Sequence, residues 1–554
     1  MLIKLTTQNN KNENHVCSEK SVRVKFSGFL RLVTIASVLI SGACFAASLE
    51  TGSGKMDVPV TVRIDNAIEY QEIAGFGATT LAGIMLTENG LRDMLGATLR
   101  HQAIKAVYHD VGLTLGSLEL WLEPANDNDD PMLINKDGFQ WETSNAMHDL
   151  LVRPARAYGF SNYSLGLKID MRRELRWMDE LRERDYSRYL QEAAEYVAAG
   201  VVHWQEITGA APRFITLFNE PLSGNRELRG GSKHEIVDII KSAGERLRAE
   251  GFARTRFIVP AEETVAKSID TIESVLADED ARSYIGALAY HAYPYDSAYS
   301  SVRRILQTSG RGLPDHDEIR IRQRLYELAA GYDIPVWMTE TSEGPGRADY
   351  PFGSAENLRA RANHIHDELV YANASAYFAM YDMWDRQSHD AHFKDRGIDF
   401  FSESSHVVLI DQKTSEIHIS GIGFAIGHFA RWITPGSLRI DAVSDNKLVK
   451  VAAFRAGKNS ELALVIINNG DFEANIDVSL ENMGLRGSVN GEYSDTSTRW
   501  KKLAPLTPLN NTRFRLTVGP VSVTSLSTGI IELNDLPSLP GVSPARFQTF
   551  SCCS

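Results

Sequence analysis

The chain has 554 residues, of which 43% are hydrophobic and 23% are charged, and its formal net charge is −13. This composition is typical of a globular protein long enough to form more than one domain. The negative charge, with no lysine- or arginine-rich block, argues against nucleic acid as a partner.

Residues 1–47 have the pattern of a secretory leader. Basic residues precede an apolar run over residues 32–47 that is shorter than the roughly 20 residues a spanning helix needs. Cys44-Phe45-Ala46 resembles a cleavage site, so we expect a secreted or periplasmic protein whose mature chain has no membrane span. The alternative is an uncleaved N-terminal anchor.

From residue 73 to residue 435, short apolar runs alternate with amphipathic segments of helix length, the clearest being 186–203 and 234–250. Eight strand–helix repeats of this kind predict a (β/α)₈ barrel with insertions. The expected strands are Ile73–Thr80, Val111–Leu120, Ser164–Met171, Phe214–Glu220, Arg256–Ala261, Ile285–His291, Val336–Thr341 and Ser375–Trp384.

After residue 435 the pattern changes to short β-type runs separated by turn residues, as at Asn468-Asn469-Gly470. This predicts an antiparallel β-sandwich over 436–535, followed by a tail over 536–554. Residues 48–72 contain an alternating strand that lies outside the barrel repeats, and we expect it to join the sandwich.

Two of the predicted buried strands end in a glutamate. The run RFITLFNEP reaches Glu220, and the run IPVWMTE ends at Glu340. Desolvating a carboxylate is costly unless it is paired or used, and the C-terminal ends of barrel strands form the active-site face. A solvated loop glutamate would explain one such residue, but two are hard to explain by packing.

A pair of carboxylates across a barrel mouth is the minimum for glycoside hydrolysis. One protonates the leaving oxygen and the other attacks the anomeric carbon, and a separation of about 5–5.5 Å gives retention. Asn219, beside Glu220, suits a contact to the sugar 2-hydroxyl, or else caps the turn before Pro221.

Other residues suit a sugar cleft. His291 and Tyr293 follow the sixth predicted strand, where Tyr293 is placed to hydrogen-bond the nucleophile and His291 is either a site residue or structural. Trp384, at the end of the eighth, offers a stacking face for a sugar ring or packs in the core.

An arginine-rich stretch follows the third predicted strand. Arg172 and Arg173 lie close to Trp177 and suit bidentate contacts to an acidic sugar or sulfate. The alternative is a charged helix start with internal ion pairs. The sequence contains no HExxH motif, no paired cysteines and no calcium-loop spacing, so we expect no metal and no cofactor.

Taken together, these motifs resemble glycoside hydrolase family 30, whose members are retaining (β/α)₈ enzymes with a linked β-sandwich. The matching elements are Gly75–Ala78, Phe218–Pro221, His291–Pro294, Trp337–Thr341 and Gly427–Ser437. The resemblance implies that Glu220 is the acid/base and Glu340 the nucleophile.

The chain departs from the family pattern in two places. The second strand lacks the arginine that the family usually carries there, and the third-strand loop is arginine-rich where the family tends to have Trp-Ser-Pro-Pro. The usual substrates, glucosylceramide and plain xylan, are therefore not carried over. We predict a monomeric retaining β-glycoside hydrolase acting on a β-linked glycan. A non-catalytic carbohydrate-binding barrel and a transglycosylase are the alternatives.

Overall fold

The computed structural model describes residues 57–80, 96–120, 130–160, 162–169, 176–222, 231–293, 316–341, 353–387, 406–456 and 461–531. The predicted leader, the tail over 536–554, and Arg172 and Arg173 lie outside these residues. No helix among the described residues combines the length and the apolar composition needed to cross a membrane.

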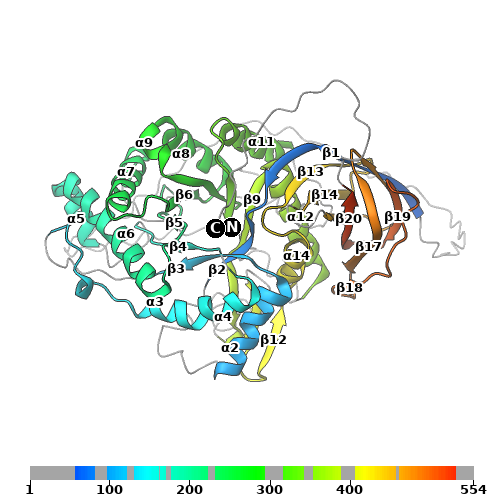
Figure 1. Cartoon of the computed structure of the whole chain (residues 1–554), viewed down its shortest axis with the longest axis horizontal. Helices are drawn as coiled ribbons and strands as arrows, with labels where there is room; N and C mark the ends of the chain where they lie inside the picture. The colour runs from blue at the N-terminus through cyan, green and yellow to red at the C-terminus, as the bar shows by residue number, and fades with distance from the viewer. Residues whose placement is uncertain are drawn as a thin grey trace, which may run out of the picture. The chain divides into compact units, whose positions relative to one another are not determined.

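Eight parallel strands form a closed barrel, as the sequence predicted (Figure 1). Strand β2 pairs with β3 on one side and with β9 on the other, which closes the ring. The strands are β2 (Gly75–Thr80), β3 (Leu115–Glu119), β4 (Ser164–Gly166), β5 (Phe214–Thr216), β6 (Arg256–Glu262), β7 (Ile285–His291), β8 (Val336–Glu340) and β9 (Ala374–Ala379).

Helices follow the strands and cover the outside of the barrel (Figure 1). Their ends are fixed by local capping: Asp185 accepts the N–H of Arg188 at the start of α6, and Ser232 accepts that of Glu235 at the start of α7. The described helices of five or more residues are α2 (Gly96–Lys105), α3 (Glu142–Met147), α5 (Arg176–Arg184), α6 (Tyr186–Thr208), α7 (Lys233–Ala249), α8 (Val265–Ala277), α9 (Glu279–Ser283), α11 (His316–Ala330), α12 (Ala355–Tyr371) and α14 (Gly421–Ala430).

Four predicted strands differ from those observed. The third and the fourth are shorter than predicted, since β4 ends at Gly166 and β5 at Thr216. The second does not begin at Val111, because residues 106–111 form a helical turn that ends at Gly112, where φ is 86°. The eighth is divided: β9 ends at Ala379, and residues 381–385 form a separate strand, β10. Strand β10 pairs with β11 (His406–Asp411), which pairs with β12 (Glu416–Ile419), so Trp384 belongs to a three-stranded sheet outside the barrel.

The remaining strands form a nine-stranded sheet in the order β18-β17-β20-β15-β14-β13-β1-β16-β19. All the pairs are antiparallel except β1 with β16. Figure 1 shows the blue β1 among the yellow-to-red strands. Buried residues from both ends of this order belong to one cluster, so the sheet bends around a core of its own. The strands are β1 (Asp57–Glu72), β13 (Leu438–Ser444), β14 (Val449–Arg455), β15 (Glu461–Asn468), β16 (Glu473–Glu481), β17 (Gly484–Ser494), β18 (Lys501–Lys502), β19 (Arg513–Val518) and β20 (Ser522–Ile531).

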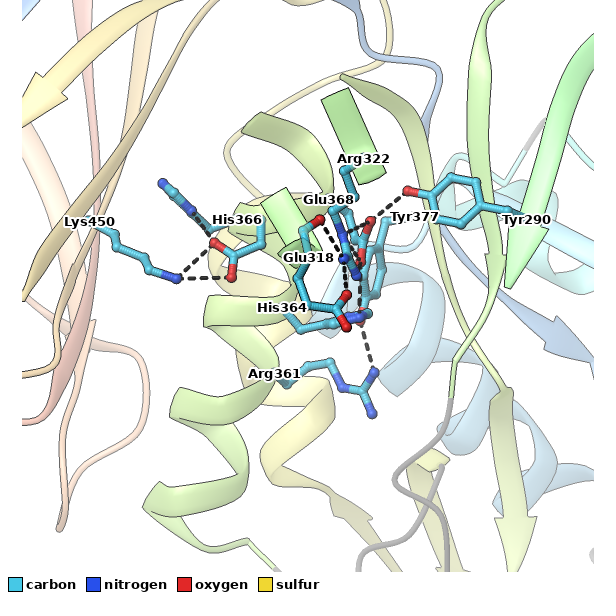
Figure 2. A network of polar contacts seen from close by, with 10 residues as sticks. Tyr290, Glu318, Arg322, Arg361, His364, His366, Glu368, Tyr377 and Lys450 are labelled. Carbon is cyan, nitrogen blue, oxygen red and sulfur yellow. Dashed lines mark hydrogen bonds and ion pairs between the residues drawn. The ribbon is translucent and has the colours of Figure 1, made fainter. Parts of the chain in front are cut away.

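Buried polar contacts join the barrel helices to this sheet. His428 of α14 contacts the hydroxyls of Ser525 and Ser494 at 2.8 and 2.7 Å. Burial lowers the pKa of His428 to about 3, so the imidazole is neutral. On α12, Asp367 pairs with Lys450 of β14 at 2.7 Å (Figure 2).

A buried ion network lies behind strand β7 (Figure 2). Glu368 of α12 is fully buried and pairs with Arg322 of α11 at 2.6 Å. The hydroxyl of Tyr290 donates to the same carboxylate at 2.6 Å. Tyr290 points to the outer face of β7, where the network lies. Because successive side chains of a strand point to opposite faces, the next residue, His291, points to the inner face.

Candidate active site

Glu220 and Glu340 are brought together at the C-terminal end of the barrel. Glu340 ends β8, and Glu220 follows β5 by four residues. One oxygen of each carboxylate and Nδ1 of His291 all lie within 4.8 Å of one another. Nδ1 is 3.0 Å from Glu220 Oε1 and 3.9 Å from Glu340 Oε1, so the imidazole contacts the first carboxylate and faces the second.

The backbone at Glu220 has an uncommon conformation that is held on both sides. Its φ is 56°, in the left-handed region that residues other than glycine rarely adopt. The N–H of Glu220 donates to the carbonyl of Ala261 at 2.8 Å, and the N–H of Leu222 donates to the carboxylate of Glu262. The turn that carries Glu220 is therefore anchored to the end of β6.

Tyr293 lies beside Glu340. Its hydroxyl donates to Glu340 Oε1 at 2.8 Å and contacts the sulfur of Met380 at 3.5 Å. The backbone N–H of Tyr293 donates to the carbonyl of Glu263. The tyrosine thus fixes one oxygen of Glu340 and the direction in which the carboxylate points.

A small cavity, of about 10 Å³, lies beside Glu340 and His291 and is lined by residues of the barrel strands and their ends. Its lining is mostly polar, with hydroxyl side chains from several strands, and only Phe218, Ala261 and Phe378 are apolar. Such a lining offers a small polar ligand several convergent hydrogen-bonding groups. The other lining residues are Thr79, Ser117, Ser164, Lys168, Thr216, Asn219, His291, Thr339 and Glu340.

A buried lysine lies in this lining, and the sequence analysis did not identify it. Nζ of Lys168 donates to Asn219 Oδ1 at 2.9 Å and is 3.0 Å from Glu119 Oε1. Lys168 is only 6% exposed, and Asn219 only 3%. The sequence signal was a lysine inside an apolar strand, which is costly to bury unless it is paired. Glu119 ends β3, the strand that lacks the arginine usual in family 30.

The two tryptophans predicted for the sugar cleft are not among the residues that line this cavity. Trp384 packs against His406 and Tyr381, with ring centroids 4.6 and 5.8 Å apart, and it does not line the cavity described above. Trp177 is on α5 and packs against the barrel core, also away from that lining. The structure brings Asn219, His291 and Tyr293 to the two glutamates.

The fold has close counterparts among solved structures. A family 30 endoxylanase from Clostridium papyrosolvens matches with a TM-score of 0.59, covering 85% of this chain and 100% of its own, at 19% identity. The catalytic domain of a family 30 xylanase from Talaromyces cellulolyticus matches with a TM-score of 0.61, covering 84% and 99%, at 16% identity. The chain has the fold of glycoside hydrolase family 30.

A comparison of the sequence with protein-family models finds no match. A putative glucosylceramidase 2 from Caenorhabditis elegans is 22% identical over 412 residues, which cover 68% of this chain and 70% of that protein. The fold that the resemblance to family 30 implied is therefore confirmed.

Proposed function

We propose that the protein is a retaining β-glycoside hydrolase that cleaves a β-linked polysaccharide or glycoconjugate. The observation that carries this proposal is the separation of Glu220 and Glu340, which have carboxylate oxygens within 4.8 Å of each other. Retaining enzymes have carboxyl groups about 5–5.5 Å apart, whereas inverting enzymes need about 6.5–9.5 Å to admit a water molecule. The short separation favours direct attack by one carboxylate.

In the first step, Glu340 attacks the anomeric carbon while Glu220 gives its proton to the glycosidic oxygen. The bond from the anomeric carbon to that oxygen breaks, and the sugar remains as an ester of Glu340. Tyr293 holds Glu340 for attack, and His291 contacts the carboxyl of Glu220.

In the second step, Glu220 removes a proton from a water molecule that attacks the same carbon. The ester bond to Glu340 breaks, and both glutamates return to their starting states. Two inversions at one carbon give net retention. The described residues supply every group that these steps use.

The similar proteins support the reaction class and leave the sugar open. The solved neighbours are named xylanases and the sequence relative a glucosylceramidase. They share glycoside hydrolysis and differ in substrate. We also propose, from the leader-like residues 1–47, that the enzyme is exported. That it acts as a monomer stays a prediction.

The deciding experiment is digestion of β-glucans, β-galactans, xylans and uronic-acid-bearing glycans by protein lacking residues 1–47. Glu340→Gln should be inactive on the glycan that the wild type cleaves. Glu273→Gln is the matched control, because Glu273 is a half-exposed carboxylate of α8 that pairs with Arg324. Binding of a glycan without cleavage would favour the carbohydrate-binding barrel, and new linkages in the products would favour the transglycosylase.

Azide separates the two catalytic roles. With an activated aryl glycoside, Glu220→Ala should yield a β-glycosyl azide, because azide attacks the sugar ester of Glu340. Glu340→Gly should yield an α-glycosyl azide, because azide takes the place of the missing nucleophile. Reversed anomers would exchange the roles, and no azide product from either variant would contradict the two-step mechanism.

A further inference from the structure

We propose that Lys168 is a positioning residue that acts through Asn219 and adapts the cavity to an uncharged sugar with a free 2-hydroxyl. The inference rests on the proposed glycosidase function. It begins from a charged side chain that neither step of that reaction uses. Lys168 is buried, lines the cavity and contacts both Asn219 and Glu119.

The ammonium group of Lys168 is surrounded by residues that pair with it or make room for its partner. A buried ammonium is costly unless it is paired, and Glu119 supplies the opposite charge at 3.0 Å. The hydroxyl of Ser117 donates to the same oxygen of Glu119 at 3.2 Å. Gly166 makes room for this carboxylate, since a Cβ there would lie 2.6 Å from Glu119 Oε2. Two adjacent barrel strands, β3 and β4, therefore cooperate to hold one ammonium group.

The ammonium determines which way the amide of Asn219 faces. Lysine has three N–H donors and no acceptor, so the atom of Asn219 that faces Nζ must be the carbonyl oxygen. The 2.9 Å contact to Oδ1 satisfies that requirement. The NH₂ group is consequently turned away from Lys168, so the amide presents its N–H donors on the side opposite the ammonium.

A donor at this position suits the oxygen next to the anomeric carbon. Asn219 immediately precedes Glu220 and shares the cavity with Glu340. A hydrogen bond to the 2-hydroxyl strengthens as the transition state forms. A cation on the carbonyl side polarises the amide and strengthens its N–H donors. Lys168 thus contributes to catalysis without touching the reacting atoms.

The charges of this site also restrict the sugar. Glu119 and Lys168 cancel each other, so the pair adds no net charge to a cavity that already holds the Glu340 carboxylate. Among the described residues that line the cavity, Lys168 is the only lysine or arginine, so a carboxylate on the sugar bound here would face Glu340 without a further compensating cation from that lining. The ring held between the two glutamates is therefore a neutral one.

The test measures the 2-hydroxyl factor, defined as the ratio of kcat/KM with and without that hydroxyl. The probes are 2,4-dinitrophenyl β-glycosides of glucose, galactose, xylose, cellobiose and xylobiose, each paired with the analogue that lacks the 2-hydroxyl on the aryl-bearing ring. Lys168→Met should reduce the factor by about tenfold or more, mainly through kcat. Lys450→Met is the matched control, because Lys450 is an equally buried lysine paired with Asp367 away from the cavity.

A second variant keeps the inference testable if Lys168→Met does not fold. Asn219→Asp retains an oxygen facing Lys168 and replaces the NH₂ donor by a second carboxylate oxygen of the same size, so it should also lose the 2-hydroxyl factor. The double variant should lose no more than Asn219→Asp alone, because both changes act on one contact.

Three results would overturn the inference. An unchanged 2-hydroxyl factor in Lys168→Met would assign the lysine a purely structural role. An unchanged factor in Asn219→Asp would remove the proposed donor. If the wild type cleaves none of these glycosides and no glycan of the panel, the proposed function itself fails. If the wild type is active but its 2-hydroxyl factor does not depend on Lys168, only the inference about Lys168 fails.

Discussion

The carboxylate of Glu262 accepts the backbone N–H of Leu222, at 3.2 Å for one oxygen and 3.3 Å for the other. Leu222 lies two residues beyond Glu220, so this contact supports the turn that carries the proposed acid. Glu262 is fully buried, and its burial raises the pKa to about 7 despite the hydrogen bonds from Leu222 and Thr271. Glu262, which holds the turn that carries Glu220, is thus itself a group that titrates near neutral pH.

Glu262 should make the stability of the protein depend on pH. Because its pKa is raised on folding, its contribution to the free energy of unfolding is complete below about pH 4.5 and is lost as the pH rises through about 7. Glu262→Gln should remove this decline, worth about 3 kcal/mol. Urea unfolding at pH 5 and pH 8 measures it, with Glu263→Gln as the control. Parallel curves for wild type and Glu262→Gln would contradict the prediction.

Removing the hydroxyl of Tyr293 should slow the reaction without unfolding the protein. Tyr293→Phe deletes the 2.8 Å hydrogen bond to Glu340 Oε1. Hydrogen bonds to charged groups are worth about 1.5–3 kcal/mol, so kcat/KM should fall about 10- to 100-fold. Steady-state kinetics measure the loss, and Tyr332→Phe, a change at an exposed tyrosine, should have no effect. Unchanged kinetics in Tyr293→Phe would show that the contact does not serve the nucleophile.

Replacing Glu220 should affect substrates according to their leaving groups. Glu220→Gln cannot donate the proton that a poor leaving group needs, whereas an activated aryl group leaves without it. We expect near-normal formation of the glycosyl-enzyme from 2,4-dinitrophenyl glycosides and a loss of about 100-fold or more on natural linkages. Pre-steady-state release of the aryl group measures the first step. Equal losses on both substrates would argue against the acid role.

The ion network behind β7 should be important for stability. Burial alone would raise the pKa of Glu368, but the charge of Arg322 and hydrogen bonds from His364 and Arg322 outweigh it and hold the pKa well below its usual range. Arg322→Met leaves this carboxylate buried without its main partner and should cost about 3–5 kcal/mol. Denaturant unfolding measures the loss. Arg322→Met/Glu368→Gln should cost less than the two single changes together, and simple additivity would mean that the pair does not act as a unit.

The sequence predicted features that depend on local pattern. Buried strands appear as apolar runs, and Glu220 and Glu340 were identified because each follows such a run directly. The division of the last barrel strand was not visible, because the stretch FAMYDMW contains no glycine or proline to mark it. Trp384 was consequently assigned to the barrel rim.

Side-chain contacts between different strands could not be predicted from the sequence. Lys168 and Glu119 are neighbours because β3 and β4 pair with Glu119 opposite Gly166, a register that no single strand specifies. Likewise, nothing in the local pattern around Glu262 shows that its carboxylate reaches the backbone of Leu222. These residues support the site. The two proposed catalytic glutamates, in contrast, could be recognised from the local sequence pattern alone.

Strand β1 is made before the barrel, yet its partners are made after it. Arg63 of β1 contacts Asp441 of β13, and these residues are 378 positions apart in the chain. At about 5–20 residues per second, β1 waits about 20 to 75 seconds during synthesis before that partner exists. Until then its edges are unpaired and open to other chains. The pairing of β1 with β13 is therefore a late step in the folding of the newly made chain. All the barrel strands have already been synthesised when it takes place.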